Sequence, residues 1–94
     1  MESRIYAKPM PNTVLVADVG GTNTTFAFIG FHQGSFHLLY TIHYNSKDIT
    51  DFSAAVREVL KAGKEKKYEV SSACFAGAGI VSEKYDFCTI TKLP

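Results

Sequence analysis

The stretch Asp18 to Asn23, which reads Asp-Val-Gly-Gly-Thr-Asn, contains the residue types and spacing most suited to chemistry. Glycines accept a positive φ and leave the backbone bare, so N–H groups around Gly20 and Gly21 can turn toward an anion. Thr22 and Asn23 add short donors at the same rim. Asp18 by itself would repel a phosphate, so its presence predicts a cation such as Mg²⁺ between the two. The stretch therefore predicts a turn that binds the phosphates of a nucleotide.

A simpler interpretation also accounts for the two glycines. An ordinary tight hairpin needs Gly-Gly between two strands without any ligand, and Gly20-Gly21 alone does not separate the two interpretations. The full six-residue string, at the first strand junction, favours the phosphate turn. It differs from a Rossmann fingerprint because no helix follows the glycines, and it lacks the lysine of a Walker A loop.

The composition suits one small domain over residues 1–94. Of the 94 residues, 46% are apolar, which is enough for a core, and the net charge of +1 gives no sign of a nucleic-acid partner. The apolar stretches are too short for a membrane span, and residues 1–13 lack the apolar core of a signal peptide. We therefore expect a cytoplasmic protein with no nucleic-acid or membrane partner.

Cysteine and histidine side chains predict no metal site. Cys74 and Cys88 form no Cys-x-x-Cys pair, and their apolar surroundings predict buried free thiols rather than a disulfide. The three histidines lack the spacing of a metal site on a helix, so we expect structural roles for them: His32, His37 and His43.

Alternating and apolar runs predict three strands after an irregular lead-in at residues 1–12. The predicted strands cover 13–19, 23–31 and 36–44, with a turn at 32–34. The third strand alternates, with Phe36, Leu38, Tyr40, Ile42 and Tyr44 on one face, which suits an antiparallel edge strand.

A helical apolar spacing follows over residues 49–62, with Asp48 as the predicted N-cap and Gly63 as the stop. A fourth strand is predicted at 70–78 and a short hairpin at 81–91. A crossover through the helix would set the fourth strand parallel to the first and beside it. With only one convincing helix, one face of this mixed α/β sheet would stay open, so we expect the isolated chain to self-associate, or to be marginally stable and bind hydrophobic dyes.

The sequence resembles the bacterial-type glucokinases, of the superfamily of sugar kinases, actin and heat-shock ATPases. The resemblance rests on Val16 to Asn23, continuing through Phe26-Ala27, and on Cys74 to Val81 followed by Thr89 to Pro94. It covers residues 14–94 in the same order and at similar spacing. It implies a ribonuclease H-like (actin-like ATPase) half-domain with the element order β-β-β-α-β plus a short hairpin.

Four residues, at three places, differ from the family pattern. Thr24-Thr25 stand where the family usually has Ala-Arg, which touches a strand interior and leaves phosphate binding intact. Ile80 replaces the proline of Gly-Pro-Val, and Lys92 replaces the asparagine before Leu-Pro. The last two changes lie toward the sugar cleft, so they leave the identity of the sugar open.

The resemblance implies an ATP-dependent kinase that converts a hexose, such as glucose, to its 6-phosphate. Asp18 would bind Mg²⁺, most simply through water, and the phosphates of ATP would lie against Gly20, Gly21, Thr22 and Asn23. The general base of the family is expected beyond Pro94, so no catalytic residue is assigned and the isolated chain is expected to be inactive. Two alternatives stay open: another ATPase or amino-sugar kinase of the superfamily, and a non-catalytic regulatory or interaction module of the same fold.

Overall fold

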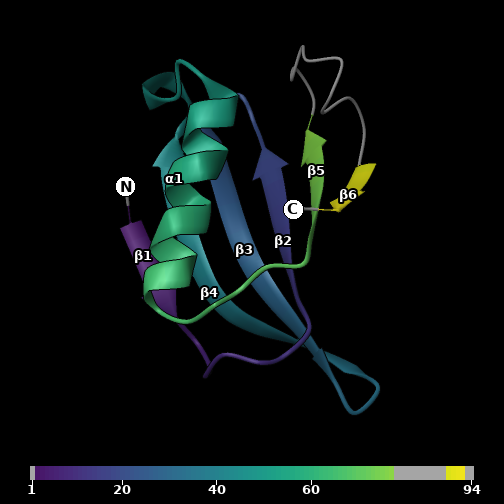
Figure 1. Cartoon of the computed structure of the whole chain (residues 1–94). Coiled ribbons are helices and arrows are strands. Elements are labelled where there is room, and N and C mark those ends of the chain that lie inside the picture. The colour runs from purple at the N-terminus through teal and green to yellow at the C-terminus, as the bar shows by residue number, and fades with distance from the viewer. Residues whose placement is uncertain (1, 78–88, 93–94) are drawn as a thin grey trace.

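A single six-stranded sheet with one helix across one face makes up the described part of the chain (Figure 1). The computed structural model describes residues 2–77 and 89–92. Its elements, in chain order, are β1 (Glu2–Ile5), β2 (Thr13–Val19), β3 (Asn23–His32), β4 (Ser35–Asn45), the short 3₁₀ helix η1 (Ser46–Asp48), α1 (Phe52–Glu65), β5 (Ser72–Gly77) and β6 (Thr89–Lys92).

The connections between the strands confirm the predicted fold class. Strands β2, β3 and β4 form an antiparallel meander, and β5 then pairs with β2 in parallel, with Val19 opposite Gly77. The chain reaches β5 by crossing the sheet through α1 (Figure 1). The order across the sheet is β1-β4-β3-β2-β5-β6, so β2 and β5 end at the same edge. The predicted hairpin at 81–91 lies mostly outside the described residues, but β6 does pair antiparallel with β5.

The lead-in contains a strand that the sequence did not predict. Residues Glu2–Ile5 form β1, which pairs antiparallel with β4, so β1 rather than β4 is the edge of the sheet. All of its side chains are exposed, and its residues carry no apolar alternation that could reveal a strand. Backbone pairing with β4 is what stabilises it, and a short polar strand is a common way to protect a sheet edge.

A bulge in β4 breaks the predicted alternation of that strand. The register between β3 and β4 shifts at Phe28/Ile29, because Phe28 lies opposite Tyr40 while Ile29 lies opposite Leu38. The extra residue, Leu39, is fully buried next to buried Tyr40. One inserted residue moves every side chain beyond it to the other face. Phe36, predicted on the core face, is therefore 74% exposed.

The helix begins later than predicted. Asp51, not Asp48, is the N-cap of α1, and its side chain accepts hydrogen bonds from the N–H groups of Ser53 and Ala54 at 3.0 and 3.3 Å. Asp48 belongs instead to η1. Both aspartates are acceptable N-caps by residue type. The end of β4 at Asn45 sets where the chain leaves the sheet, and the helix therefore begins after Asp51. None of the described helices is long and apolar enough to span a membrane.

Gly63 was predicted to end the helix, but it lies within α1, which continues to Glu65. A Cβ at Gly63 would lie 2.4 Å from Cε2 and 2.5 Å from Cζ of Phe28. The absent side chain lets the helix approach β3 closely, and the Phe28 ring is fully buried there. The helix ends at Glu65, and Lys67, just beyond the C-cap Lys66, has a φ of 72°.

Helix α1 covers the sheet face on which the core residues gather. The helix contributes buried Val56 and Val59, and the sheet contributes fully buried Leu15, Phe26 and Phe28. Alternate residues of β2, such as Val14 and Val16, are only half-buried and lie on the face opposite the helix. No described helix covers that face.

The cysteine prediction is wrong for Cys74. This residue is half-buried on β5, but it is disulfide-bonded in the structure rather than a free thiol. Cys88 lies outside the described residues.

We predict that Gly63→Ala destabilises the fold, although Gly to Ala within a helix is usually stabilising. The added methyl group must displace the Phe28 ring, which should lower the free energy of unfolding by about 1–3 kcal/mol. Urea denaturation followed by circular dichroism would measure this. Lys64→Ala, on the exposed surface of the same helix turn, is the control and should change stability little. Equal stability of Gly63→Ala and the parent chain would contradict the close contact.

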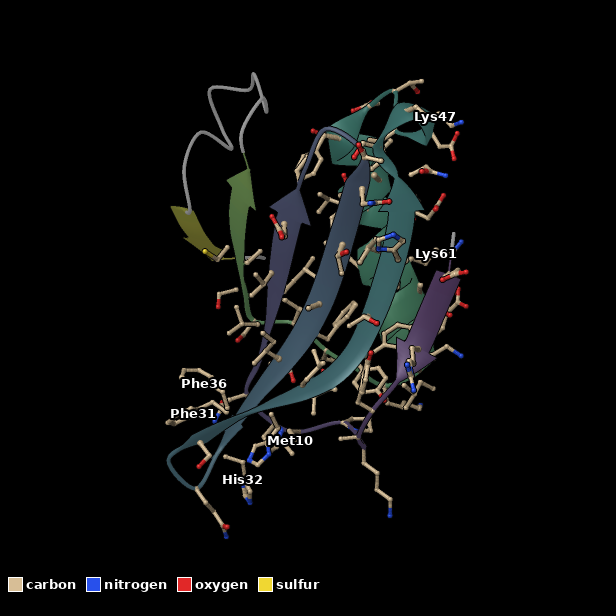
Figure 2. All side chains as sticks on the ribbon, turned by 180° about the vertical axis from the view of Figure 1, so that it is seen from behind. Met10, Phe31, His32, Phe36, Lys47 and Lys61 are labelled. Carbon is tan, nitrogen blue, oxygen red and sulfur yellow. The ribbon has the colours of Figure 1, made fainter. Side chains whose placement is uncertain are left out.

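We also predict that the isolated chain binds hydrophobic dyes and self-associates. Phe31 and Phe36, with ring centroids 5.0 Å apart, are 42% and 74% exposed near the turn between β3 and β4 (Figure 2). The strand register places both rings on the face that α1 leaves uncovered, and large exposed apolar areas are uncommon on monomers. Dye fluorescence and light scattering at several concentrations would test this, with Phe36→Gln expected to reduce both signals. A dye-negative monomer at all concentrations would contradict it.

Candidate functional site

The turn between β2 and β3 lies at the sheet edge where β2 and β5 both end (Figure 1). Asp18 is exposed near the end of β2, and Gly20, Gly21 and Thr22 form the exposed turn before β3. Asn23 is exposed at the start of β3. The structure therefore brings all five predicted residues together at one rim.

Of the two glycine properties behind the prediction, the structure shows the bare backbone but not the positive φ. Among the described glycines only Gly34, in the β3–β4 turn, has a positive φ, so neither Gly20 nor Gly21 needs a left-handed backbone. A Cβ at Gly20 would lie 3.0 Å from the carbonyl oxygen of Asn23, which is a tight contact. A Cβ at Gly21 would meet nothing within 4 Å. Gly21 thus leaves the backbone at the tip of the turn bare toward open space.

Hydrogen bonds fix the carbonyl side of this turn and leave N–H groups without a partner. The Gly20 N–H donates to the Asn23 carbonyl oxygen at 2.9 Å. The carbonyl oxygens of Gly20 and Thr22 both accept hydrogen bonds from Ser46, at 2.6 and 2.9 Å. Within the described residues the N–H groups of Gly21 and Thr22 donate no hydrogen bond. Bare N–H groups at a turn form a local positive site for an anion.

Asp18 lies beside this turn on the uncovered face of the sheet. It is opposite Thr25 on β3, and Thr25 is opposite His43 on β4, so the three side chains form one row across the strands. The Asp18 carboxylate makes no ion pair or hydrogen bond with the described residues. No group of three potential metal ligands occurs in the described part of the chain. One unpaired carboxylate at the rim is the arrangement that Mg²⁺ uses when phosphates and water supply its other ligands.

His43 orients Asn23 at the same rim. Its Nε2 lies 3.3 Å from Asn23 Oδ1, and its Nδ1 lies 2.9 Å from Thr25 Oγ1. An amide oxygen only accepts, so Nε2 donates to Asn23, and in the neutral ring Nδ1 accepts from the Thr25 hydroxyl. The amide nitrogen of Asn23 therefore keeps both of its donors for a ligand. This contact agrees with the structural role expected for the histidine.

Ser46 is the site residue that the sequence did not predict. It directly follows β4, and Asn45 is opposite Asn23 only because of the bulge at Leu39. Without that extra residue, the two-residue turn at Gln33 and Gly34 would set Tyr44 opposite Asn23 instead. Apolar residues stand at every second position through residues 36–44, and this pattern gives no sign of the bulge. The strand pairing that brings Ser46 to the turn could therefore not be predicted from residue types.

Behind the turn, Tyr44 connects β4 to the helix. Its hydroxyl donates to Glu58 Oε1 at 2.6 Å, and burial together with this carboxylate raises the pKa of the Tyr44 phenol well above its usual range. Tyr68 shows the same direction of change, since burial raises its pKa; its hydroxyl donates to the Ala7 carbonyl oxygen at 2.7 Å. Both phenols thus remain neutral donors that bind separate segments together.

The sheet order, the crossover and the glycine turn define the actin-like fold in the form that sugar kinases use. The glucokinase family model matches residues 15–94, and the chain belongs to the glucokinase family. A similar solved structure is the crystal structure of a glucokinase from an Antarctic psychrotroph, with 32% sequence identity and a TM-score of 0.59. The match covers 78% of this chain and 23% of that chain, so this chain spans about a quarter of that glucokinase. No curated protein matched the sequence.

Proposed function

We propose that this chain supplies the first phosphate-binding turn of an ATP-dependent hexose kinase, which converts glucose to glucose 6-phosphate in the intact protein. The single observation that supports this most is the turn itself. Within residues 2–77 and 89–92, the N–H groups of Gly21 and Thr22 at its open tip have no hydrogen-bond partner, and neither does the Asp18 carboxylate beside them. Family membership supports the sugar kinase, and the choice of glucose and ATP is our inference from it.

Each residue of the turn has a separate task in this proposal. The N–H groups of Gly21 and Thr22 donate to oxygens of the β- and γ-phosphates, and the Asn23 amide nitrogen adds a side-chain donor. These donors are already oriented before the ligand binds, so no reorganisation is required as charge develops during transfer. Phosphoryl transfer depends chiefly on such positioning and charge stabilisation.

Asp18 would bind Mg²⁺, most simply through a water molecule, on the phosphate side of the turn. When bound, the ion neutralises charge on the phosphate oxygens. The residues fit this ion because a carboxylate that has no partner among the described residues lies beside donors that suit phosphate. Asp18 itself would accept a hydrogen bond from the coordinated water and orient it, and its negative charge would favour the cation.

The proton of the sugar hydroxyl requires a general base that the described residues do not offer. Asp51 is engaged as the cap of α1, and Asp48 lies in η1, beyond the end of β4. Asp86 lies outside the described residues. Following the resemblance to the glucokinases, we place the base in the part of a glucokinase that this chain does not span.

In the intact protein, Asp18→Asn should lower kcat by about 10- to 100-fold, because the neutral amide keeps the shape of the hairpin but loses the charge that favours the metal. The KM for glucose should change little. Steady-state kinetics over a range of Mg²⁺ concentrations would measure both. Asp48→Asn removes the same charge from an exposed residue of η1 and is the matched control. A loss confined to glucose affinity, with kcat intact, would contradict the role of Asp18.

The chain by itself should show no ATP-dependent glucose phosphorylation above background. The hairpin provides one side of a nucleotide site and no general base, so any binding of nucleotide should be weak. A coupled assay with the purified chain would test this, and the intact protein would serve as the positive control. Sustained turnover by the chain alone would contradict the division of tasks proposed above.

A further inference from the structure

Ser46 makes more hydrogen bonds to the β2–β3 turn than any turn residue makes within it. Its Oγ donates to the Gly20 carbonyl oxygen at 2.6 Å, and its N–H donates to the Thr22 carbonyl oxygen at 2.9 Å. The same Oγ lies 2.8 Å from Thr24 Oγ1. One half-buried serine at the end of β4 thus contacts the turn on both sides of Gly21.

The directions of these hydrogen bonds can be assigned. A serine hydroxyl has one hydrogen, and Ser46 uses it toward the Gly20 carbonyl oxygen. The Thr24 hydroxyl must then donate to Ser46 Oγ. Thr24 is fully buried, so its hydroxyl has no water to bind instead. The result is a chain of two hydrogen bonds, from the Thr24 hydroxyl to Ser46 Oγ and from Ser46 Oγ to the Gly20 carbonyl oxygen.

This chain of hydrogen bonds sets the orientation of the Gly20–Gly21 peptide. All described peptide bonds are trans, and in a planar trans peptide the C=O and N–H groups point in opposite directions. The bond from Ser46 draws the Gly20 carbonyl oxygen inward, and the Gly21 N–H therefore faces away from Ser46. A rotated peptide would instead present a carbonyl oxygen where an anion should bind, and glycine offers little resistance to that rotation.

We propose that Ser46 is a positioning residue that keeps the Gly20 and Thr22 carbonyl oxygens away from the bound phosphates and the Gly21 N–H toward them. This inference rests on the proposed phosphate-binding function of the turn. It assigns the role to a residue outside the glycine stretch, at the start of η1. Thr24 supports Ser46 by fixing the orientation of its hydroxyl.

Three variants of the intact protein test the proposal in order of severity. Ser46→Ala removes both side-chain hydrogen bonds and should lower kcat/KM for ATP by about 3- to 10-fold, the loss expected for one or two net hydrogen bonds. Thr24→Val removes only the supporting donor and should have a smaller effect. Ser46→Thr retains the hydroxyl and should restore activity. Ser53→Ala, the same substitution in α1 at a serine whose hydroxyl makes no hydrogen bond to the turn, is the matched control.

A second measurement separates positioning from general stability. The backbone amide signals of Gly21 and Thr22 in ¹⁵N NMR spectra should shift when inorganic phosphate or Mg-ATP is added to the parent protein. They should shift less at the same concentration in Ser46→Ala, while the KM for glucose stays close to that of Ser53→Ala and amide signals far from the turn keep their parental positions.

The outcomes distinguish this proposal from the function on which it rests. If Asp18→Asn lowers turnover but Ser46→Ala and Thr24→Val retain parental ATP kinetics and amide shifts, the role of Ser46 is wrong and the phosphate turn stands. If Asp18→Asn and Ser46→Ala both leave ATP kinetics unchanged, the proposed function of the turn fails as well. If Ser46→Thr is as impaired as Ser46→Ala, the hydroxyl is not the group responsible.

Discussion

The packing of β3 aromatic rings against α1 is the contact on which the rest of the structure depends. Phe28 is fully buried and lies where any side chain at Gly63 would stand. Phe26 stacks on Phe52 at the start of the helix, with ring centroids 6.0 Å apart. These two contacts fix the helix at both ends along β3. Burial of apolar side chains is the main favourable contribution to the free energy of folding of a small domain.

The position of the helix in turn determines where the functional rim forms. Because α1 crosses the sheet from β4 to β5, β5 enters beside β2 and runs parallel to it. The ends of both strands then lie at the same edge as the β2–β3 turn and η1 (Figure 1). Ser46, at the junction of β4 and η1, reaches the turn as a consequence. The packing of α1 on one face of the sheet thus determines which residues meet at the β2–β3 turn.

The two faces of the sheet differ in a way that fits membership of a larger protein. One face is sealed by α1, while Val14 and Val16 on the other face remain half-buried without a covering helix in the described chain. Asp18, Thr25 and His43 lie in one row on that same open face. A polar row and an apolar strip on one surface suit a site that is completed by further segments, as the 23% coverage of the related glucokinase also suggests.

The sequence by itself determined the local elements and the turn. The apolar run at β2, the glycines at 20 and 21 and the helical spacing after residue 49 each depend on neighbours within a few positions, so residue types suffice to predict them. Tertiary structure decided three other features: the β1 edge strand, the bulge at Leu39, and the passage of α1 through Gly63. Each arises from contacts between distant segments. The strand β1 forms by pairing with the free edge of β4. The helix continues through Gly63, where the Phe28 ring occupies the space that a side chain at position 63 would need. The bulge sets the register that brings Ser46 to the turn, and no local pattern encodes a register between strands.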